Sequence, residues 1–179
     1  MGDSLTCGWN GRQGAPGFLD EYDEKFPAAR FRLIHCGIPA GTAHHGLHRP
    51  QRDVLDHNPD CVLVQFGLND ASCGYTPEEF GKDIEGIIRG IREQTSFEIV
   101  LVASVCLETE KANLFVEGYY GQLQKMAALH GLPLAQVHVY WRNKISGGVR
   151  FGDLVKADRV NPVSHAYRFM AEAIMELLL

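Results

Sequence analysis

The sequence predicts an α/β fold in which a parallel sheet is covered by helices on both faces. The chain of 179 residues has the length of one ordinary domain. Short apolar runs alternate along it with longer segments of helical periodicity. This alternation is typical of parallel strands joined by helical crossovers. Residues 1–179 are therefore expected to form a single three-layer α/β/α domain.

Four runs rich in Val, Ile, Leu or Phe are predicted to be buried parallel strands, since such strands are covered on both faces. The predicted strands are Phe31–His35, Cys61–Phe66, Ile99–Val105 and Leu134–Val139. The carboxyl ends of parallel strands share one edge of the sheet, and ligands of open α/β folds bind beyond that edge. Polar residues directly after these runs are therefore candidates for a site.

Three segments are predicted to be helices. Thr76 begins a capping box, apolar residues recur behind it at helical spacing, and this helix is expected to end near Gln94. A second helix is expected over Ala112–His130, closed by Gly131. The third should run from about Pro162 to the C-terminus.

The segment Trp141–Ala157 is predicted to be a loop, because it has little periodicity and contains three glycines. A lid over the carboxyl edge of the sheet and an ordinary connection to the last helix both fit this pattern.

Composition and charge argue against several classes of protein. The net charge is -5 and the basic residues are scattered, which disfavours a nucleic-acid partner. No apolar run approaches the ~20 residues that a membrane span needs, and the chain starts without a basic and apolar leader. Five cysteines without a CxxC pair are typical of reduced, mostly buried thiols. These features together favour a cytoplasmic protein.

Three short motifs follow one another in an informative order. Gly2-Asp3-Ser4-Leu5-Thr6 places a serine among small and turn-forming residues. Gly37-Ile38-Pro39-Ala40-Gly41-Thr42 follows the first predicted strand, and Gly67-Leu68-Asn69-Asp70 follows the second. The two loops are therefore expected at the same edge of the sheet.

In these motifs the chain resembles the GDSL, or SGNH, hydrolases, whose motifs are a GDS serine, a glycine loop, a GxND loop and a late DxxH. The resemblance implies a flavodoxin-like fold and a cofactor-free esterase or acylhydrolase that cleaves a carboxylic ester through a Ser4 acyl-enzyme. It assigns the oxyanion hole to the backbone N–H groups of Ser4 and Gly37 and to the side chain of Asn69. Such donors stabilise the negative charge that acyl transfer places on a carbonyl oxygen.

The last motif departs from the family at the position of the general base. The resemblance predicts Asp-x-x-His-Pro, whereas the chain has Asp158-Arg159-Val160-Asn161-Pro162. Asn161 has no titrating nitrogen and cannot take a proton from Ser4, so the implied catalytic set of Ser4, Asp158 and Asn161 should be impaired. His165 is the nearest histidine, one helical turn further on. An engineered substitution and a natural, catalytically inactive ligand-binding member of the fold are both compatible with Asn161.

Two further departures from the family concern the strand before the GDS motif and the residues of the second motif. Relatives carry a central strand directly before the GDS motif, whereas Met1 immediately precedes Gly2 here. The N-terminal strand is therefore expected to be absent, which would expose backbone groups of its neighbours and favour a homo-oligomer. In the second motif, His35 and Ala40 stand where Asn and Gly are usual.

Other kinds of site fit parts of the sequence less well. A histidine cluster has a spacing that can present metal ligands, but histidines on a solvated amphipathic helix that also carries Asp53 and Asp56 explain it without a metal. The cluster comprises His44, His45, His48 and His57. A flavodoxin-like nucleotide or phosphate binder is disfavoured because the chain has no P-loop or GxGxxG motif.

Overall fold

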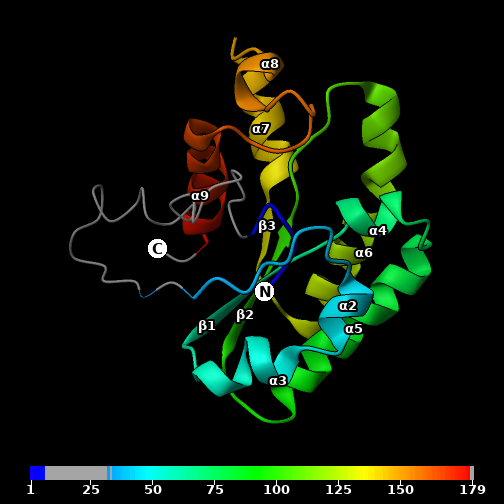
Figure 1. The fold of residues 1–179 in the computed structure, drawn as a ribbon, viewed down its shortest axis with the longest axis vertical. Helices are drawn as coiled ribbons and strands as arrows, with labels where there is room; N and C mark the ends of the chain where they lie inside the picture. The colour runs from blue at the N-terminus through cyan, green and yellow to red at the C-terminus, as the bar shows by residue number, and fades with distance from the viewer. Residues whose placement is uncertain (7–31, 33, 178–179) are drawn as a thin grey trace.

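The computed structural model describes residues 1–6, 32 and 34–177, and its strands form a parallel sheet between two layers of helices (Figure 1). The strands β1 (Cys61–Gln65), β2 (Glu98–Ala103) and β3 (Leu134–Gln136) lie in the order β1-β2-β3. Val64 of β1 pairs with Leu101 of β2, which pairs in turn with Leu134 of β3. The predicted α/β class and parallel sheet are confirmed.

The helices divide between the two faces of the sheet (Figure 1). One side carries α2 (Ala43–Leu47), α3 (Pro50–Asp53), η1 (Leu55–His57), α4 (Leu68–Ser72), α5 (Pro77–Arg92) and α6 (Glu110–His130). The remaining helices are α7 (Val137–Ser146), α8 (Phe151–Leu154), η2 (Ser164–Ala166) and α9 (Tyr167–Met175), and α7 packs against α9. None of the helices in the described ranges has the length and apolarity of a membrane span.

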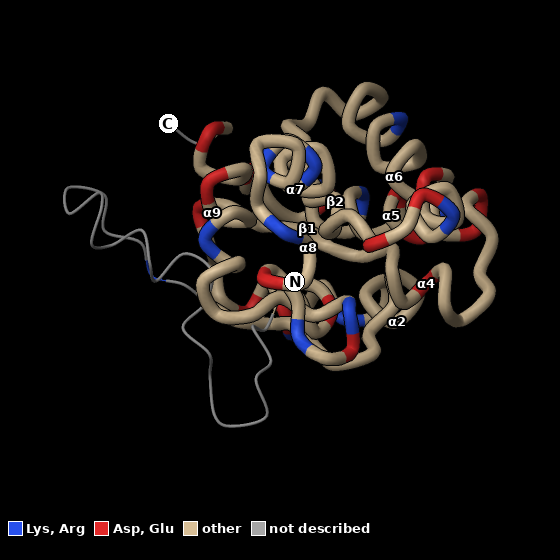
Figure 2. Tube along the Cα trace, turned by 90° about the horizontal axis from the view of Figure 1, so that it is seen from above, with Lys and Arg blue, Asp and Glu red and all other residues tan. Residues whose placement is uncertain are grey.

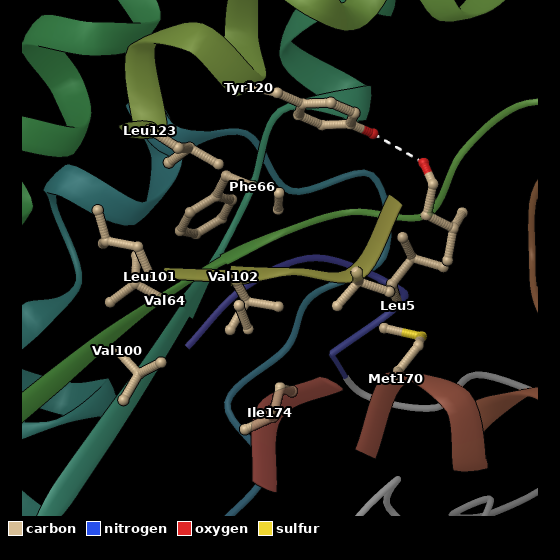
Figure 3. Packing of buried hydrophobic residues seen from close by; sticks show 14 of the residues in the cluster. Leu5, Val64, Phe66, Val100, Leu101, Val102, Tyr120, Leu123, Met170 and Ile174 are labelled. Carbon is tan, nitrogen blue, oxygen red and sulfur yellow. Dashed lines mark hydrogen bonds between the residues drawn. The ribbon is translucent and has the colours of Figure 1, made fainter. Parts of the chain in front are cut away.

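Buried side chains fill the space on both sides of the strands. Leu123 and Tyr120 from α6 lie on one side with Phe66, whereas Met170 and Ile174 from α9 lie on the other (Figure 3). All five are at most 3% exposed. Positions of Lys and Arg are interspersed with those of Asp and Glu along the described chain (Figure 2). The core thus lies in the two interfaces between sheet and helices.

The first residues of the chain pair with the sheet although no strand is assigned to them. Gly2 forms parallel bridges to Gln65, the last residue of β1, and to Gly37. The amide of Gln65 donates to the carbonyl oxygen of Met1 at 3.2 Å, and that of Ile38 donates to the carbonyl oxygen of Gly2 at 3.0 Å. Residues 1–2 therefore occupy the position between β1 and the 36–38 segment.

The predicted strand Phe31–His35 lies partly outside the described residues. Arg32, Ile34 and His35 are described, and none of them is in a strand. The pairing expected of this run is made one residue further along, at Cys36–Ile38.

The prediction of a loop over Trp141–Ala157 is wrong at two places. Residues 141–146 continue α7, and residues 151–154 form α8. Val137, His138 and Trp141 are buried at helical spacing, and Trp141 is 0% exposed. Burial of one helical face therefore stabilises a helix here although glycines follow it. The strand predicted to reach Val139 ends at Gln136.

Other boundaries differ by a few residues. The predicted strands at 61–66 and 99–105 correspond to β1 and β2, and the capping box at Thr76 is present. The last helix begins at Tyr167 rather than near Pro162, because η2 comes first. Asp53 was expected on a solvated helix but is 8% exposed, where it pairs with Arg49 at 2.9 Å and Arg52 at 2.7 Å.

Two glycines, one within α6 and one directly after it, should respond oppositely to substitution by alanine. Gly131 ends the helix in the left-handed region at φ 60°, where a β-carbon is unfavourable, so Gly131→Ala should lower the free energy of unfolding by about 1–2 kcal/mol. Gly121 lies within the helix with no other atom near the position of a β-carbon, and Gly121→Ala should raise it by about 0.5–1 kcal/mol. Urea unfolding of both variants tests this, and equal effects would contradict the assigned helix end.

Candidate active site

Ser4 lies in a tight turn directly after the paired residues Met1 and Gly2, at the carboxyl edge of the sheet. The carboxylate of Asp3 accepts a hydrogen bond from the amide of Leu5 at 2.9 Å. The hydroxyl of Thr6 and the side-chain oxygen of Gln65 are 3.0 Å apart in a hydrogen bond. Ser4 is half-buried, while Asp3 and Leu5 on either side of it are buried. These hydrogen bonds and the burial of Asp3 and Leu5 fix the turn, and Ser4 is partly exposed to solvent.

Asp3 is a buried carboxyl group with an elevated pKa. It is 1% exposed, and burial raises its pKa from 3.8 to about 7, with a further contribution from the nearby carboxylate of Asp70. Hydrogen bonds from the backbone amides of Leu5 and Thr6 act in the opposite direction but do not offset the burial. Asp3 therefore changes its charge near neutral pH directly beside Ser4.

The elevated pKa of Asp3 predicts a pH-dependent stability. Between pH 3.8 and about pH 7 the folded protein holds a proton that the unfolded chain has released, so the free energy of unfolding falls as the pH rises through this window. The whole effect is on the order of 4 kcal/mol. Asp3→Asn keeps an oxygen for the Leu5 amide and should abolish this loss, as measured by urea unfolding at pH 5 and pH 8. Asp60→Asn, at an exposed carboxylate, is the control, and a parallel decline in Asp3→Asn would contradict the assignment.

Two loops beside Ser4 are joined by consecutive residues of α4. The side-chain amide of Asn69 donates to the carbonyl oxygen of Gly41 at 3.0 Å. The carboxylate of Asp70 accepts from the amide of Ala43 at 2.8 Å and from that of Gly67 at 3.0 Å, and this side chain is 0% exposed. The loop before α2 is therefore fastened to the start of α4 at both positions.

Gly41 lies close to the backbone of the turn that carries Ser4. A β-carbon on Gly41 would lie 3.5 Å from the carbonyl oxygen of Gly2 and 3.8 Å from Cα of Asp3. The structure thus places Asn69 beside the segment that carries Ser4. Gly41 itself was not singled out from the sequence, although a glycine directly before the helix cap Thr42 is a signal for such a contact.

Gly37, the other predicted oxyanion donor, belongs to the paired 36–38 segment. Its neighbours bond to Gly2: the carbonyl oxygen of Cys36 accepts from the Gly2 amide at 3.4 Å, and the Ile38 amide donates back to Gly2. In a parallel ladder, the residue between two such bonds turns its own N–H away from the partner strand. The role of Gly37 as a donor stays a prediction. Ala40, three residues later, has φ 58° and occupies the tip of the same loop.

The last motif forms a hydrogen-bonded turn around Asp158. One carboxylate oxygen accepts from the backbone amides of Val160 at 2.9 Å and Asn161 at 2.8 Å. The other accepts from the side-chain nitrogen of Asn161 at 2.8 Å. Burial alone would raise the pKa of Asp158, but these hydrogen bonds hold it below its ordinary value. Within the described residues, the side-chain oxygen of Asn161 is buried without a hydrogen-bond partner.

The histidines weighed from the sequence lie elsewhere. His165 is exposed on η2. In the histidine cluster, His44 lies 3.4 Å from the carboxylate of Asp83, and its ring stacks on Tyr75 and meets His48 edge-on. Within residues 1–6, 32 and 34–177, no group of three or more His, Cys, Asp or Glu side chains is arranged to hold a metal ion.

Comparison with known proteins gives one family. Residues 1–159 match the model of the GDSL-like Lipase/Acylhydrolase family. The thioesterase 1/protease 1/lysophospholipase L1 of Escherichia coli strain K12 is 22% identical over 136 residues, which are 75% of this chain and 62% of the relative. The match thus spans less than two thirds of that relative's length.

Solved structures of several hydrolases share the fold. LAE5, an α/β hydrolase enzyme from the metagenome of Lake Arreo in Spain, superimposes with a TM-score of 0.82 at 21% identity, covering 98% of this chain and 91% of LAE5. The lipase/acylhydrolase of Enterococcus faecalis gives a TM-score of 0.81 at 22% identity, covering 99% and 92%. The acetylxylan esterase Axe2 of Geobacillus stearothermophilus gives 0.82 at 18% identity, covering 98% and 90%.

Proposed function

The chain belongs to the GDSL-like lipase/acylhydrolase family, and we propose that it is a serine ester hydrolase in which Ser4 is the nucleophile and Asn161 replaces the general base. The substrate class is a carboxylic ester of small or medium size, and no cofactor takes part. The named relatives include a thioesterase/lysophospholipase and an acetylxylan esterase, so an acyl group is the part of the substrate that they share.

The reaction requires attack by the Ser4 hydroxyl on the ester carbonyl. The C–O bond to the alcohol then breaks, the alcohol leaves with a proton, and water hydrolyses the acyl-enzyme. Negative charge on the carbonyl oxygen would be stabilised by the backbone N–H groups of Ser4 and Gly37 and by the Asn69 side chain. The contact of Asn69 with Gly41 and that of Asp70 with Ala43 support this arrangement, because they fix the end of the 37–42 loop to the start of α4.

One observation carries the assignment of Asn161 to the base position. Its side-chain nitrogen donates to Asp158 at 2.8 Å, as the N–H of a catalytic imidazole donates to its carboxylate. An amide in this place satisfies the carboxylate but accepts no proton at neutral pH. In this proposal the site has a nucleophile at Ser4 and a carboxylate at Asp158, but the residue at the base position does not titrate, so turnover is expected to be slow.

Covalent labelling tests the nucleophile. In the Asn161→His variant, a fluorophosphonate probe should add to Ser4, as located by mass spectrometry of the N-terminal peptide, and labelling should disappear in Ser4→Ala/Asn161→His. Asn161→Gln is the matched control, because it retains an amide without a base. Label on another residue, or undiminished label after Ser4→Ala, would refute the nucleophile assignment.

A catalytically inactive ligand-binding protein is the second candidate, and Asn161 itself is the observation that favours it. The buried side-chain oxygen of Asn161 is an acceptor for a donor group of a bound molecule. Calorimetry of the unmodified chain with p-nitrophenyl acetate and with acetylated xylo-oligosaccharide separates the two candidates: heat of binding without product formation supports the binding protein.

A further inference from the structure

The turn that carries Asp158 and Asn161 is the tip of a short hairpin-like segment. Val155 forms an antiparallel bridge with Pro162, and the amide of Val163 donates to the carbonyl oxygen of Leu154 at 3.0 Å. Nearer the tip, the amide of Lys156 donates to the carbonyl oxygen of Asn161 at 2.8 Å. These bonds fix the shape of the 156–161 turn, and the buried Leu154 and Val155 hold the base of the segment in the core, so the exposed tip at residues 157–160 is the part whose position they do not fix.

Arg159, within this turn, makes a contact with another part of the molecule. Its Nε donates to one carboxylate oxygen of Glu108 at 2.9 Å, and a terminal guanidinium nitrogen pairs with the other oxygen. The guanidinium lies 5.4 Å from the ring centre of Phe151, and a β-carbon on Gly152 would lie 3.3 Å from it. Arg159 has φ 59°, in the left-handed region that a residue of its type rarely adopts. The turn is thus tied to α8 and to Glu108 through one side chain.

Glu108 lies on a loop that is itself anchored at the end of β2. The amide of Leu107 donates to the side chain of Asn113 at 2.9 Å, and that side chain donates back to the Leu107 carbonyl oxygen at 2.7 Å. The hydroxyl of the buried Tyr120 donates to the carbonyl oxygen of Val105 at 2.8 Å. A continuous series of contacts therefore leads from the edge of the sheet through Glu108 to the 156–161 turn.

From these contacts we propose that Arg159 and Glu108 are positioning residues, which set the place of residue 161 over the carboxyl edge of the sheet. This proposal rests on the proposed function, because it assigns the purpose of the pair to the base position. A bidentate guanidinium–carboxylate pair defines orientation as well as distance, which a single hydrogen bond does not. The side chains are 46% and 45% exposed, so salt can screen the pair, and either residue can be substituted without disturbing the core.

The kinetic test uses the Asn161→His variant as the parent. Arg159→Ala and Glu108→Ala should each lower kcat by about 10-fold or more with KM little changed, because the base is misplaced while the ester site is intact. The double variant should be no slower than the worse single variant, and the exchanged pair Arg159→Glu/Glu108→Arg should recover part of the loss. Arg150→Ala is the control, because Arg150, the N-cap residue of α8, makes the same bidentate pair with Asp153 three residues further along and does not contact the 156–161 turn through it. An equal loss in Arg150→Ala, or additive losses in the double variant, would overturn the proposal.

A measurement without catalysis separates this proposal from the proposed function. In the unmodified chain, hydrogen exchange of the Val160 and Asn161 amides, which both donate to Asp158, should be faster in Arg159→Ala and unchanged in Arg150→Ala. Faster exchange together with an inactive Asn161→His variant would leave the positioning role standing and refute the esterase. Unchanged exchange would refute the positioning role whatever the activity.

Discussion

Asn161→His is expected to raise the rate of p-nitrophenyl acetate hydrolysis by about 10²–10⁴-fold, the range that general acid–base catalysis contributes. The carboxylate that would orient the imidazole is already in place, because Asp158 accepts from the side-chain nitrogen of Asn161 at 2.8 Å. The N–H of the new imidazole would take over this hydrogen bond, which leaves its other nitrogen as the acceptor for the Ser4 proton. The gain should appear mainly in kcat.

Three comparisons make this result specific. Asn161→Gln should show no gain, since it has no titrating nitrogen. In the Asn161→His background, Ser4→Ala should abolish the added activity, and Asp158→Asn should remove most of it, because the imidazole would lose its orientation. An equal gain in Asn161→Gln, or none in Asn161→His, would show that residue 161 does not stand at the base position.

Trp141→Ala should lower the free energy of unfolding by about 3–5 kcal/mol, the usual cost of removing a large buried aromatic side chain. Trp141 is 0% exposed and lies on the buried face of α7. Urea unfolding followed by circular dichroism measures the loss. Val139→Ala, on the same helix but 39% exposed, should change the free energy of unfolding by only about 0.5 kcal/mol.

The indole of Trp141 also allows a finer test of the same packing. Its N–H is buried and has no hydrogen-bond partner among the described residues. Trp141→Phe keeps most of the apolar volume and removes this unsatisfied donor, so it should cost far less than Trp141→Ala. Equal costs for the two variants would indicate that the indole is held by a polar contact rather than by packing.

The parts of the fold that were predicted from the sequence are those with a local signal. The apolar runs at β1 and β2 and the capping box at Thr76 each specify an element within a few neighbouring residues. The meeting of the 37–42 and 67–70 loops, which the bond from Asn69 to Gly41 shows, could also be predicted, since parallel strands deliver their following loops to the same side.

The parts that were missed depend on contacts between distant segments. Trp141 belongs to a helix because its burial against the rest of the molecule stabilises that segment, whereas the local sequence, rich in β-branched and polar residues, predicts a strand and a loop. Asp53 is buried because two arginines surround it. Arg159 and Glu108 are 51 positions apart, and no pattern in either neighbourhood indicates that they meet.

The pairing of Met1 and Gly2 with the sheet also has a consequence for the order of folding. The sheet from β1 to β3 and the helices between its strands come from one continuous stretch, residues 61–136. The bond from the Met1 nitrogen to the Leu63 carbonyl oxygen instead joins residues 62 positions apart, whereas Cys61 of β1 and its partner Glu98 in β2 are 37 apart, so the N-terminal bond closes a longer loop at a slightly greater cost in entropy. An intermediate with the sheet formed and residues 1–6 undocked would therefore contain a folded core but no nucleophile site. In such an intermediate the nucleophile site would be restored only when residues 1–6 dock again.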